Sequence, residues 1–229
     1  MTRTRWIIFI VICLGILSAI IFVGKNNNSS SNYSGDPLTV ITEGPIADHV
    51  FGSDSDKVVL IEYGDFQCPG CGSAYPIIKE VTEEYSDQLT FVFRNLPLTT
   101  IHPNALAAAT AAEAAGLQGK YFEYHDLLYA SQNAWKDASV SDRTSLYAGY
   151  AEQLGLNVDT FTADLTNSTI TDKINRDRST ASTLGIGSTP TFLLNGEQLG
   201  QDIAFDKDKL KQAINDELTK AGIALPSGK

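Results

Sequence analysis

The chain opens with a long apolar segment. Residues 6–23 are apolar apart from Gly15 and Ser18. A helix of this length spans about 27 Å, close to the apolar thickness of a bilayer. Cleaved export signals have shorter apolar cores and end in a small-x-small cleavage site, which Phe22-Val-Gly24 does not provide. The pattern therefore predicts an uncleaved signal anchor over residues 1–25, forming a single transmembrane helix.

The residues on either side of this segment indicate how the protein is oriented. Arg3 and Arg5 precede the apolar run and only Lys25 follows it, which favours a cytoplasmic N-terminus. Residues 26–36 (NNNSSSNYSGD) are polar and low in complexity, as flexible linkers are. We therefore expect a protein of the cell membrane that holds a folded domain, residues 37–229, outside the cytoplasm, where disulfides persist.

Beyond the linker, the spacing of apolar residues predicts a strand, a helix and a second strand. Residues 57–63 form a largely apolar run that is typical of a buried strand, and residues 89–93 alternate as a core strand does. Residues 71–85 between them have helical composition. This order predicts a β-α-β unit with parallel strands. Residues 38–42 add a candidate edge strand.

A helical block follows, and a hairpin and a last helix close the domain. The expected helices are residues 103–116, 121–130, 141–154 with Ser141 as the N-cap, 159–165 and 168–184. Asn195-Gly196 predicts a hairpin turn after residues 191–194, and residues 207–220 have helical spacing. The block of about residues 103–185 is too long for a simple crossover. We therefore expect an α/β domain with a helical insertion.

Composition narrows the class of protein. Of the chain's 229 residues, 43 % are hydrophobic and 19 % charged, as in ordinary folded domains. Three cysteines are too few for a disulfide-rich scaffold. Of the 17 basic residues, Arg3, Arg5 and Lys25 precede the folded domain, which leaves 14 against 27 acidic residues. A domain this acidic is a poor partner for nucleic acid or an anionic lipid surface.

Two of the three cysteines lie in Cys68-Pro-Gly-Cys71, between the first predicted strand and the helix after it. Pro69 suits the first turn of a helix, which places Cys68 at the helix N-terminus. Free amides and the helix dipole stabilise a thiolate there, and the thiolate is the reactive form of cysteine. Cys71 lies one turn further on. The motif therefore favours redox exchange, with one sulfur placed to attack and the other to resolve.

Two other uses of the cysteine pair remain as alternatives. A zinc site needs four ligands, but the chain has no second cysteine pair and its three histidines are unclustered. A purely structural disulfide across so short a loop would remove little entropy from the unfolded chain. Among the polar residues nearby, we expect Asp65 to cap the loop and His102 to pack at a helix end.

The segment around the cysteines resembles a known family. Ile61-Glu-Tyr-Gly-Asp-Phe-Gln-Cys-Pro-Gly-Cys71 is similar to the active-site segment of DsbA-like thiol–disulfide oxidoreductases, within the thioredoxin superfamily. Pro76 stands where thioredoxin-like active-site helices often carry a kinking proline. Gly187-Ser-Thr-Pro-Thr-Phe-Leu-Leu-Asn-Gly196 resembles the family's cis-proline loop and the strand after it. The resemblance covers about residues 58–220 and implies a thioredoxin-like fold with a helical insertion between the β-α-β unit and the cis-proline hairpin.

The resemblance also implies roles for individual residues. Cys68 would be the nucleophile and Cys71 the resolving thiol of a redox-active disulfide, with no organic cofactor and no metal. Glu62 matches an acidic residue that the family keeps beneath its active site, and it would accept the proton of Cys71. The alternative is that the pleat of the strand turns Glu62 towards solvent. Thr189 and Pro190 would form a cis peptide bond that faces the cysteines and presents backbone to an extended substrate.

We therefore expect an extracytoplasmic dithiol oxidant that introduces disulfides into cysteine-containing exported proteins. The resemblance implies that a membrane quinone-linked partner reoxidises it. Gly70 replaces the histidine of DsbA's own motif, so Cys68 would depend on the helix N-terminus and the protein would be a milder oxidant. Two alternatives remain. One is a disulfide reductase or isomerase on the same fold, and the other is a membrane-anchored, chaperone-like binding module with a structural disulfide.

Overall fold

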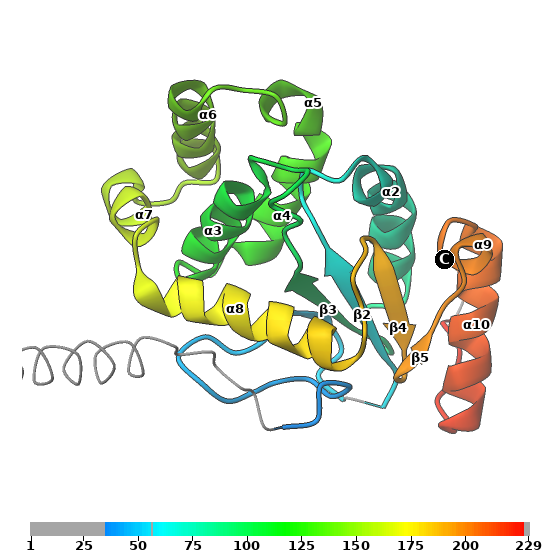
Figure 1. Ribbon diagram of the computed structural model, residues 1–229. Helices are drawn as coiled ribbons and strands as arrows, with labels where there is room; N and C mark the ends of the chain where they lie inside the picture. The colour runs from blue at the N-terminus through cyan, green and yellow to red at the C-terminus, as the bar shows by residue number, and fades with distance from the viewer. Residues whose placement is uncertain (1–34, 56, 227–229) are drawn as a thin grey trace, which may run out of the picture. The chain divides into compact units, whose positions relative to one another are not determined.

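The β-α-β unit expected from the sequence forms the centre of the protein in its computed structural model (Figure 1). Strand β2 (Val59–Gly64) and strand β3 (Thr90–Asn95) pair in parallel, and helix α2 (Pro69–Glu84) connects them. Both strands are buried along their whole length, which suits parallel strands covered on both faces. The order and the parallel pairing predicted from the sequence are confirmed.

The structure describes residues 35–55 and 57–226. The predicted membrane anchor and nearly all of the predicted linker lie outside these residues, so both stay predictions. Within the described part of the chain, no helix has the length and the apolar character that crossing a bilayer requires.

The sheet has the strand order β1-β3-β2-β4-β5. Strand β4 (Thr191–Leu194) runs antiparallel to β2, and β5 (Glu197–Gln198) pairs with β4 as the second arm of a hairpin. In the turn between them, Asn195 has φ 47° and Gly196 has φ +84°. A two-residue Asn-Gly turn requires these positive values, and the predicted hairpin is confirmed. The short helix α9 (Gln201–Ala204) follows.

The edge of the sheet differs from the prediction. Residues 38–42, the expected edge strand, form no strand, and the edge is instead β1 (Val50–Gly52), antiparallel to β3. The backbone before β1 has side-chain partners: Arg94 donates hydrogen bonds to the carbonyls of Pro37 and Thr39. Because a buried arginine satisfies these carbonyls, the segment does not pair with a neighbouring strand.

Six helices of the described chain lie between β3 and β4, where the sequence predicts the insertion (Figure 1). They are α3 (Ala105–Gly116), α4 (Tyr121–Ala130), α5 (Gln132–Trp135), α6 (Val140–Gln153), α7 (Val158–Asp164) and α8 (Ser168–Thr183). Helix α6 is capped by Ser139, whose side chain accepts from the amide of Asp142, and not by Ser141 as predicted. The α/β thioredoxin-like fold with a helical insertion is therefore confirmed.

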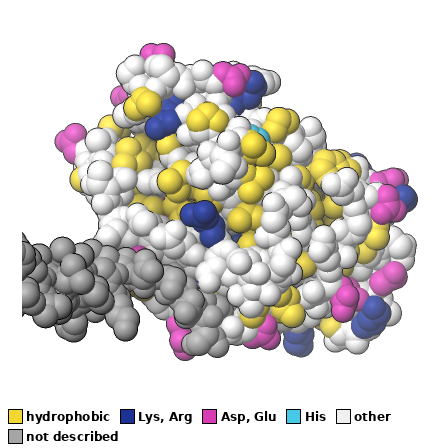
Figure 2. Space-filling model, viewed as in Figure 1, with side chains coloured by type: hydrophobic (Ala, Val, Ile, Leu, Met, Phe, Trp, Pro, Cys, Tyr) yellow, Lys and Arg dark blue, Asp and Glu magenta, His cyan; other side chains and the backbone are white. Residues whose placement is uncertain are grey.

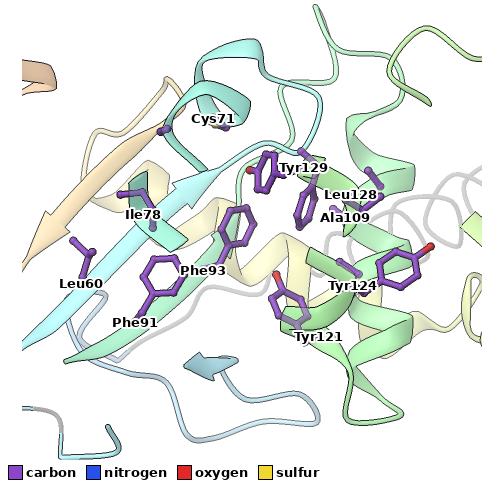
Figure 3. Close-up of a cluster of buried hydrophobic side chains, with 14 of the residues drawn as sticks. Leu60, Cys71, Ile78, Phe91, Phe93, Ala109, Tyr121, Tyr124, Leu128 and Tyr129 are labelled. Atoms are coloured by element: carbon purple, nitrogen blue, oxygen red, sulfur yellow. The ribbon is translucent and has the colours of Figure 1, made fainter. Parts of the chain in front are cut away.

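Alternate residues of β2 face two separate hydrophobic cores. Leu60 belongs to the larger core, which α2, α3, α4 and α10 (Lys207–Lys220) complete. Tyr63 belongs to the smaller core on the other face of the sheet, with Ala181 of α8. Figure 3 shows part of the larger core, which reaches from Cys71 to the aromatic side chains of α4. The cysteine pair thus belongs to the larger of the two cores.

A buried cluster of charged side chains joins the insertion to the other face of the sheet. The Arg94 guanidinium of β3 lies 2.8 Å from Asp48 Oδ2, and both side chains are fully buried. Lys173 of α8 lies 2.7 Å from Asp177 and 3.4 Å from Asp48. Burial raises the pKa of Asp48, but Lys173 and Arg94 outweigh it and hold that pKa below its ordinary value. The Asp48 carboxylate is therefore charged and surrounded by cations.

Candidate active site

Cys68 lies at the start of α2, as the sequence predicts. It is the N-cap residue of this helix, its backbone is extended, and Pro69 is the first helical residue. The amide of Gly72 donates to the carbonyl of Cys68 at 3.1 Å. The Cys68 thiol is thus placed beside the free amides of the helix N-terminus, where a negative charge is stabilised.

The surroundings of Cys68 favour its thiolate. The residue is 8 % exposed, and its Sγ lies 3.4 Å from the carbonyl oxygen of Thr189. A hydrogen bond from the Cys71 thiol lowers the pKa of Cys68 most. Burial opposes this effect, while the Thr189 side chain and the amides of Gly70 and Cys71 add to it, which gives a pKa of about 5. The helix N-terminus therefore contributes as expected, but the neighbouring thiol contributes more.

Cys71 has the opposite environment. It is fully buried, and the amide of Asp65 donates to its Sγ at 3.5 Å. Burial raises the pKa of Cys71 well above its ordinary value, and the hydrogen bond to Cys68 and the charge of Glu62 raise it further. Both sulfurs are free thiols in this structure. The site thus pairs a slightly exposed thiol whose pKa is lowered with a fully buried thiol whose pKa is raised.

Glu62 lies inside the domain, opposite Phe93 on the neighbouring strand. It is only 3 % exposed, so the alternative of a solvent-facing side chain is wrong. Burial raises the pKa of Glu62 to about 8, and the negative charge of Cys68 contributes. Glycine at position 64 leaves room for the carboxyl, because a Cβ there would lie 3.0 Å from Glu62 Oε1. A carboxyl with this pKa can take up and release a proton near neutral pH.

The loop before β4 faces the cysteines. The Thr189-Pro190 peptide bond is cis, as expected. A Cβ added at Gly70 would lie 3.2 Å from Pro190 Cδ and 3.6 Å from Cys68 Sγ. The Thr189 hydroxyl is buried and has no hydrogen-bond partner among the described residues, which leaves it free to donate to a Cys68 thiolate. That this loop holds a substrate stays a prediction.

Asp65 fixes the loop between β2 and α2. Its carboxylate accepts from the amides of Gln67 at 2.7 Å and Leu98 at 2.9 Å, and it lies 2.8 Å from His102 Nδ1. The predicted capping role is confirmed. His102 has a specific partner in addition to its place at a helix end. The loop that carries Cys68 is therefore tied to the segment after β3.

Gln132 of α5 is a site residue that the sequence pattern does not reveal. Its side-chain amide donates to the carbonyls of Phe66 at 2.8 Å and Cys68 at 3.0 Å. It fits there because residue 72 is glycine: a Cβ at Gly72 would lie 2.6 Å from Gln132 Oε1. No local motif could have identified this residue, since it reaches the redox loop only through the fold of the insertion.

A groove of about 740 Å³ opens beside the cysteines. It is lined by Gln67 and Pro69, which flank Cys68, by loop residues 101–104, and by residues 136–140 and Arg143 of the insertion. Ile101 and Val140 in its wall are 67 % and 68 % exposed. The groove therefore offers apolar as well as polar surface next to the reactive thiol.

Replacing Gly70 with histidine is expected to lower the pKa of Cys68 by about 1, because an imidazolium there would lie beside the thiolate. A lower pKa makes Cys68 a better leaving group and the disulfide a stronger oxidant. Titration of the thiolate absorbance and the reduction potential would measure both effects. Gly70→Ala is the matched control, since its Cβ makes the same contact with Pro190 without a charge. An unchanged titration in Gly70→His would contradict the prediction.

The fold and the cysteine pair define the class of the protein: a thioredoxin-fold thiol–disulfide oxidoreductase. A family model described as thioredoxin matches residues 45–216. The chain therefore belongs to this thioredoxin family. The matched residues include the redox loop, the insertion and all five strands of the described sheet.

Curated relatives share part of this chain. Na(+)/H(+) antiporter NhaA 1 of Salinispora arenicola is 41 % identical over 154 residues, which cover 67 % of this chain and 22 % of the antiporter. Na(+)/H(+) antiporter NhaA 1 of Mycobacterium sp. is 38 % identical over 156 residues, which cover 67 % of this chain and 24 % of the antiporter. The chain thus spans about a quarter of the length of these relatives, and their name describes the longer proteins.

Solved structures resemble the domain over most of its length. A variant of α-DsbA1 from Wolbachia pipientis is 25 % identical, with a TM-score of 0.66, over 81 % of this chain and 96 % of that one. Oxidised BdbD from Bacillus subtilis is 22 % identical, with a TM-score of 0.65, over 79 % of this chain and 99 % of that one. The domain therefore has the DsbA-type fold, a thioredoxin sheet with a helical insertion.

Proposed function

We propose that the protein is an extracytoplasmic dithiol oxidant that introduces disulfides into exported proteins. A substrate thiolate attacks Sγ of Cys68, the Cys68–Cys71 bond breaks, and Cys71 leaves as a thiolate that takes a proton from Glu62. The substrate's second thiolate then attacks the substrate sulfur of the mixed disulfide, and Cys68 leaves as a thiolate. The substrate loses two electrons to form its disulfide, and the protein ends as a dithiol.

The observation that carries this proposal is the placement of Cys68 at the N-terminus of α2, with its Sγ 3.4 Å from the Thr189 carbonyl of the cis-proline loop and with Cys71 buried one turn further on. The hydrogen bond from Cys71 lowers the pKa of Cys68 most, to about 5, which lies between the values of about 3.5 for DsbA and about 7 for thioredoxin. A more stable thiolate leaves more readily and favours the reduced form of the protein, which makes the disulfide more oxidising. The same environment is consistent with a milder oxidant than DsbA.

Two surface features support a polypeptide as the substrate. The groove beside Cys68 is large and has the exposed apolar side chains of Ile101 and Val140 in its wall. Figure 2 shows apolar side chains reaching the surface over the middle of one face, with acidic side chains mostly around its edge. Unfolded exported chains present apolar and backbone groups together, so such a surface suits them better than a small charged ligand.

The cellular setting proposed here rests on the sequence. The predicted anchor, residues 1–25, would hold the protein in the cell membrane with its N-terminus in the cytoplasm and the domain outside. A membrane quinone-linked partner would accept two electrons from the Cys68–Cys71 dithiol and restore the disulfide. The acidic domain gives no reason to expect nucleic acid as a partner.

The reduction potential of the Cys68–Cys71 pair tests the proposal. The full-length protein would be equilibrated in glutathione buffers and its redox state followed by thiol trapping. A potential of about −120 to −180 mV would support an oxidant or isomerase, and about −270 mV or lower would indicate a reductase. Oxidation of a reduced, unfolded protein would separate oxidant from isomerase. Cys68→Ala should lose this activity entirely, whereas a chaperone-like module would keep its activity.

A further inference from the structure

The proposed exchange leaves Glu62 with a proton that must come from solvent or return to it. Glu62 is nearly inaccessible to solvent, but its side chain lines a cavity of about 30 Å³ between the sheet, α2 and α4. A cavity of this size can hold a water molecule if polar groups surround it. Its other polar lining comes from α2 and α4: Tyr75, Lys79, Thr82, Glu83, His125 and Asp126.

His125 brings an unpartnered nitrogen to this cavity. Its Nδ1 lies 3.0 Å from Asp126 Oδ1, so the carboxylate keeps a proton on Nδ1 and leaves Nε2 as an acceptor. Nε2 is buried and has no hydrogen-bond partner in the described part of the chain. Aromatic rings enclose the imidazole, with the Phe93 ring 4.8 Å and the Tyr129 ring 5.0 Å from it between centroids. His125 and Glu62 line the same cavity, whose wall also includes the apolar side chains of Phe51, Ile78, Phe91 and Phe122. A water molecule held there could bridge the two polar groups.

Asp126 connects this histidine to the surface. Its side chain is 29 % exposed, and its second oxygen binds Lys79, which is 39 % exposed. Burial raises the pKa of Asp126, but His125 and Lys79 outweigh it and hold that pKa below its ordinary value. Burial lowers the pKa of His125. The resting pair is thus a neutral imidazole hydrogen-bonded to a carboxylate at the protein surface.

We propose that the His125–Asp126 pair carries protons between the buried Glu62 carboxyl and solvent, through water in this cavity. The inference rests on the proposed function, in which Glu62 exchanges a proton with Cys71. When Cys71 attacks a mixed disulfide at Cys68, its proton goes to Glu62 and then through water to His125 Nε2. The Nδ1 proton of the resulting imidazolium leaves through Asp126 to solvent. The path runs in reverse when the disulfide is reduced.

The geometry fits a relay that acts on rate and not on equilibrium. The proton that enters at Nε2 is balanced by the one that leaves at Nδ1, so the net charge of the pair is unchanged and His125 becomes its Nε2–H tautomer. The reverse passage, when the disulfide is reduced, restores the Nδ1–H form. The ionisable groups that face His125 are Asp126, Tyr121 and Tyr129 on α4, Tyr75, Lys79 and Glu83 on α2, and Glu62 on β2. Removing the relay should therefore slow exchange in both directions without changing the reduction potential.

The test is the rate at which Cys71 resolves a mixed disulfide between Cys68 and glutathione. Full-length reduced protein reacts with oxidised glutathione at low pH, which forms the mixed disulfide at Cys68 and releases one reduced glutathione. Excess reagent is removed and the pH is raised. Mass spectrometry of acid-quenched samples then follows the loss of the bound glutathione as the Cys68–Cys71 disulfide forms. His125→Phe keeps the ring in its aromatic surroundings but removes both nitrogens. Asp126→Asn is a second variant at a partly exposed position, and Glu62→Gln removes the buried carboxyl itself.

At pH 7, His125→Phe is expected to resolve the mixed disulfide at least about tenfold more slowly than wild type. This loss is smaller than the roughly hundredfold or greater contribution of a group that transfers a proton directly to or from a reacting atom. Asp126→Asn should also be slower. The difference should shrink as the pH rises, because base from solvent then replaces the relay. A wild-type rate in both variants at pH 7 would overturn the proposal. So would an equal slowing at every pH together with a changed reduction potential, since that pattern indicates a structural role.

Two comparisons separate this inference from the function on which it rests. His49→Phe makes the same substitution at a histidine that also pairs with a carboxylate, Glu113, but does not line the cavity, and its rate at pH 7 should match wild type. If the wild-type protein itself fails to release glutathione, the proposed exchange and the relay both fail. If wild type resolves the mixed disulfide and His125→Phe and Asp126→Asn do so equally fast, the relay alone fails.

Discussion

Replacing Arg94 with methionine is expected to lower the free energy of unfolding by about 3–5 kcal/mol, because it removes one partner of a buried ion pair and leaves Asp48 partly uncompensated. The substitution also removes the donor for the carbonyls of Pro37 and Thr39. Those carbonyls form no sheet ladder that could take its place. Chemical denaturation followed by circular dichroism would measure the loss.

A surface ion pair provides the control for this prediction. Lys207 lies 2.9 Å from Glu80, but both side chains are well exposed. Exposed pairs contribute little to stability, so Lys207→Met should leave the unfolding midpoint nearly unchanged. A similarly small effect of Arg94→Met would show that the buried cluster does not stabilise the fold as its geometry indicates.

The buried cluster around Asp48 also makes the free energy of unfolding depend on pH in acid. The folded-state pKa of Asp48 lies below its ordinary value of 3.8. The stability that this shift contributes is therefore complete above that pH and is lost as the pH falls through the lower folded-state value. In Arg94→Met the shift should be smaller, so its unfolding free energy should fall less steeply in acid than that of wild type.

Cys71→Ser is expected to convert a transient intermediate into the main product. With oxidised glutathione, the Cys68 thiolate attacks one sulfur, forms a mixed disulfide and expels reduced glutathione. In wild type, Cys71 then displaces the second glutathione, so little adduct should accumulate. Without a thiol at position 71, most molecules should carry one glutathione, which intact-protein mass spectrometry would detect and a reductant would remove.

The matched control is the same substitution at the other cysteine. Cys71 is fully buried and its pKa is raised by burial, so Cys68→Ser should form almost no adduct. Equal adduct in both variants would contradict the assignment of Cys68 as the nucleophile. Cys71→Ala adds a further comparison, because alanine cannot donate to the Cys68 thiolate as serine can. The pKa of Cys68 should therefore be higher in Cys71→Ala than in Cys71→Ser.

Local sequence signals account for most of the fold. The apolar run before Cys68, the alternation before Arg94 and the Asn195-Gly196 turn each specify an element from their own residues. The edge of the sheet differs from the prediction because the side chain that binds this segment is distant in sequence: Arg94 donates to the carbonyls of Pro37 and Thr39. The four-residue helix α5 was missed because one turn is too short to show helical spacing.

Some residues of the site can likewise be predicted from local sequence, and others cannot. Cys68, Cys71, Glu62 and the Thr189-Pro190 loop lie in or beside recognisable sequence segments, and their roles in the exchange stay predictions. His125 and Gln132 were not identified. A single polar residue in a helix carries no periodic signal, and their significance depends on groups brought to them by β2 and the redox loop. The role proposed for His125 depends on its neighbour Asp126 and on the buried Glu62, which lies on a distant strand.

The contact between Gln132 and Gly72 makes two distant positions depend on each other. A side chain at residue 72 would place its Cβ 2.6 Å from Gln132 Oε1, so the Gln132 amide would have to shift. That shift would weaken its hydrogen bonds to the carbonyls of Phe66 and Cys68. The insertion is therefore not an exchangeable module. A chimera that takes its insertion from a relative must also take that relative's residue at position 72. Otherwise the side chain that replaces Gln132 will not match the space beside residue 72 or the carbonyls of Phe66 and Cys68.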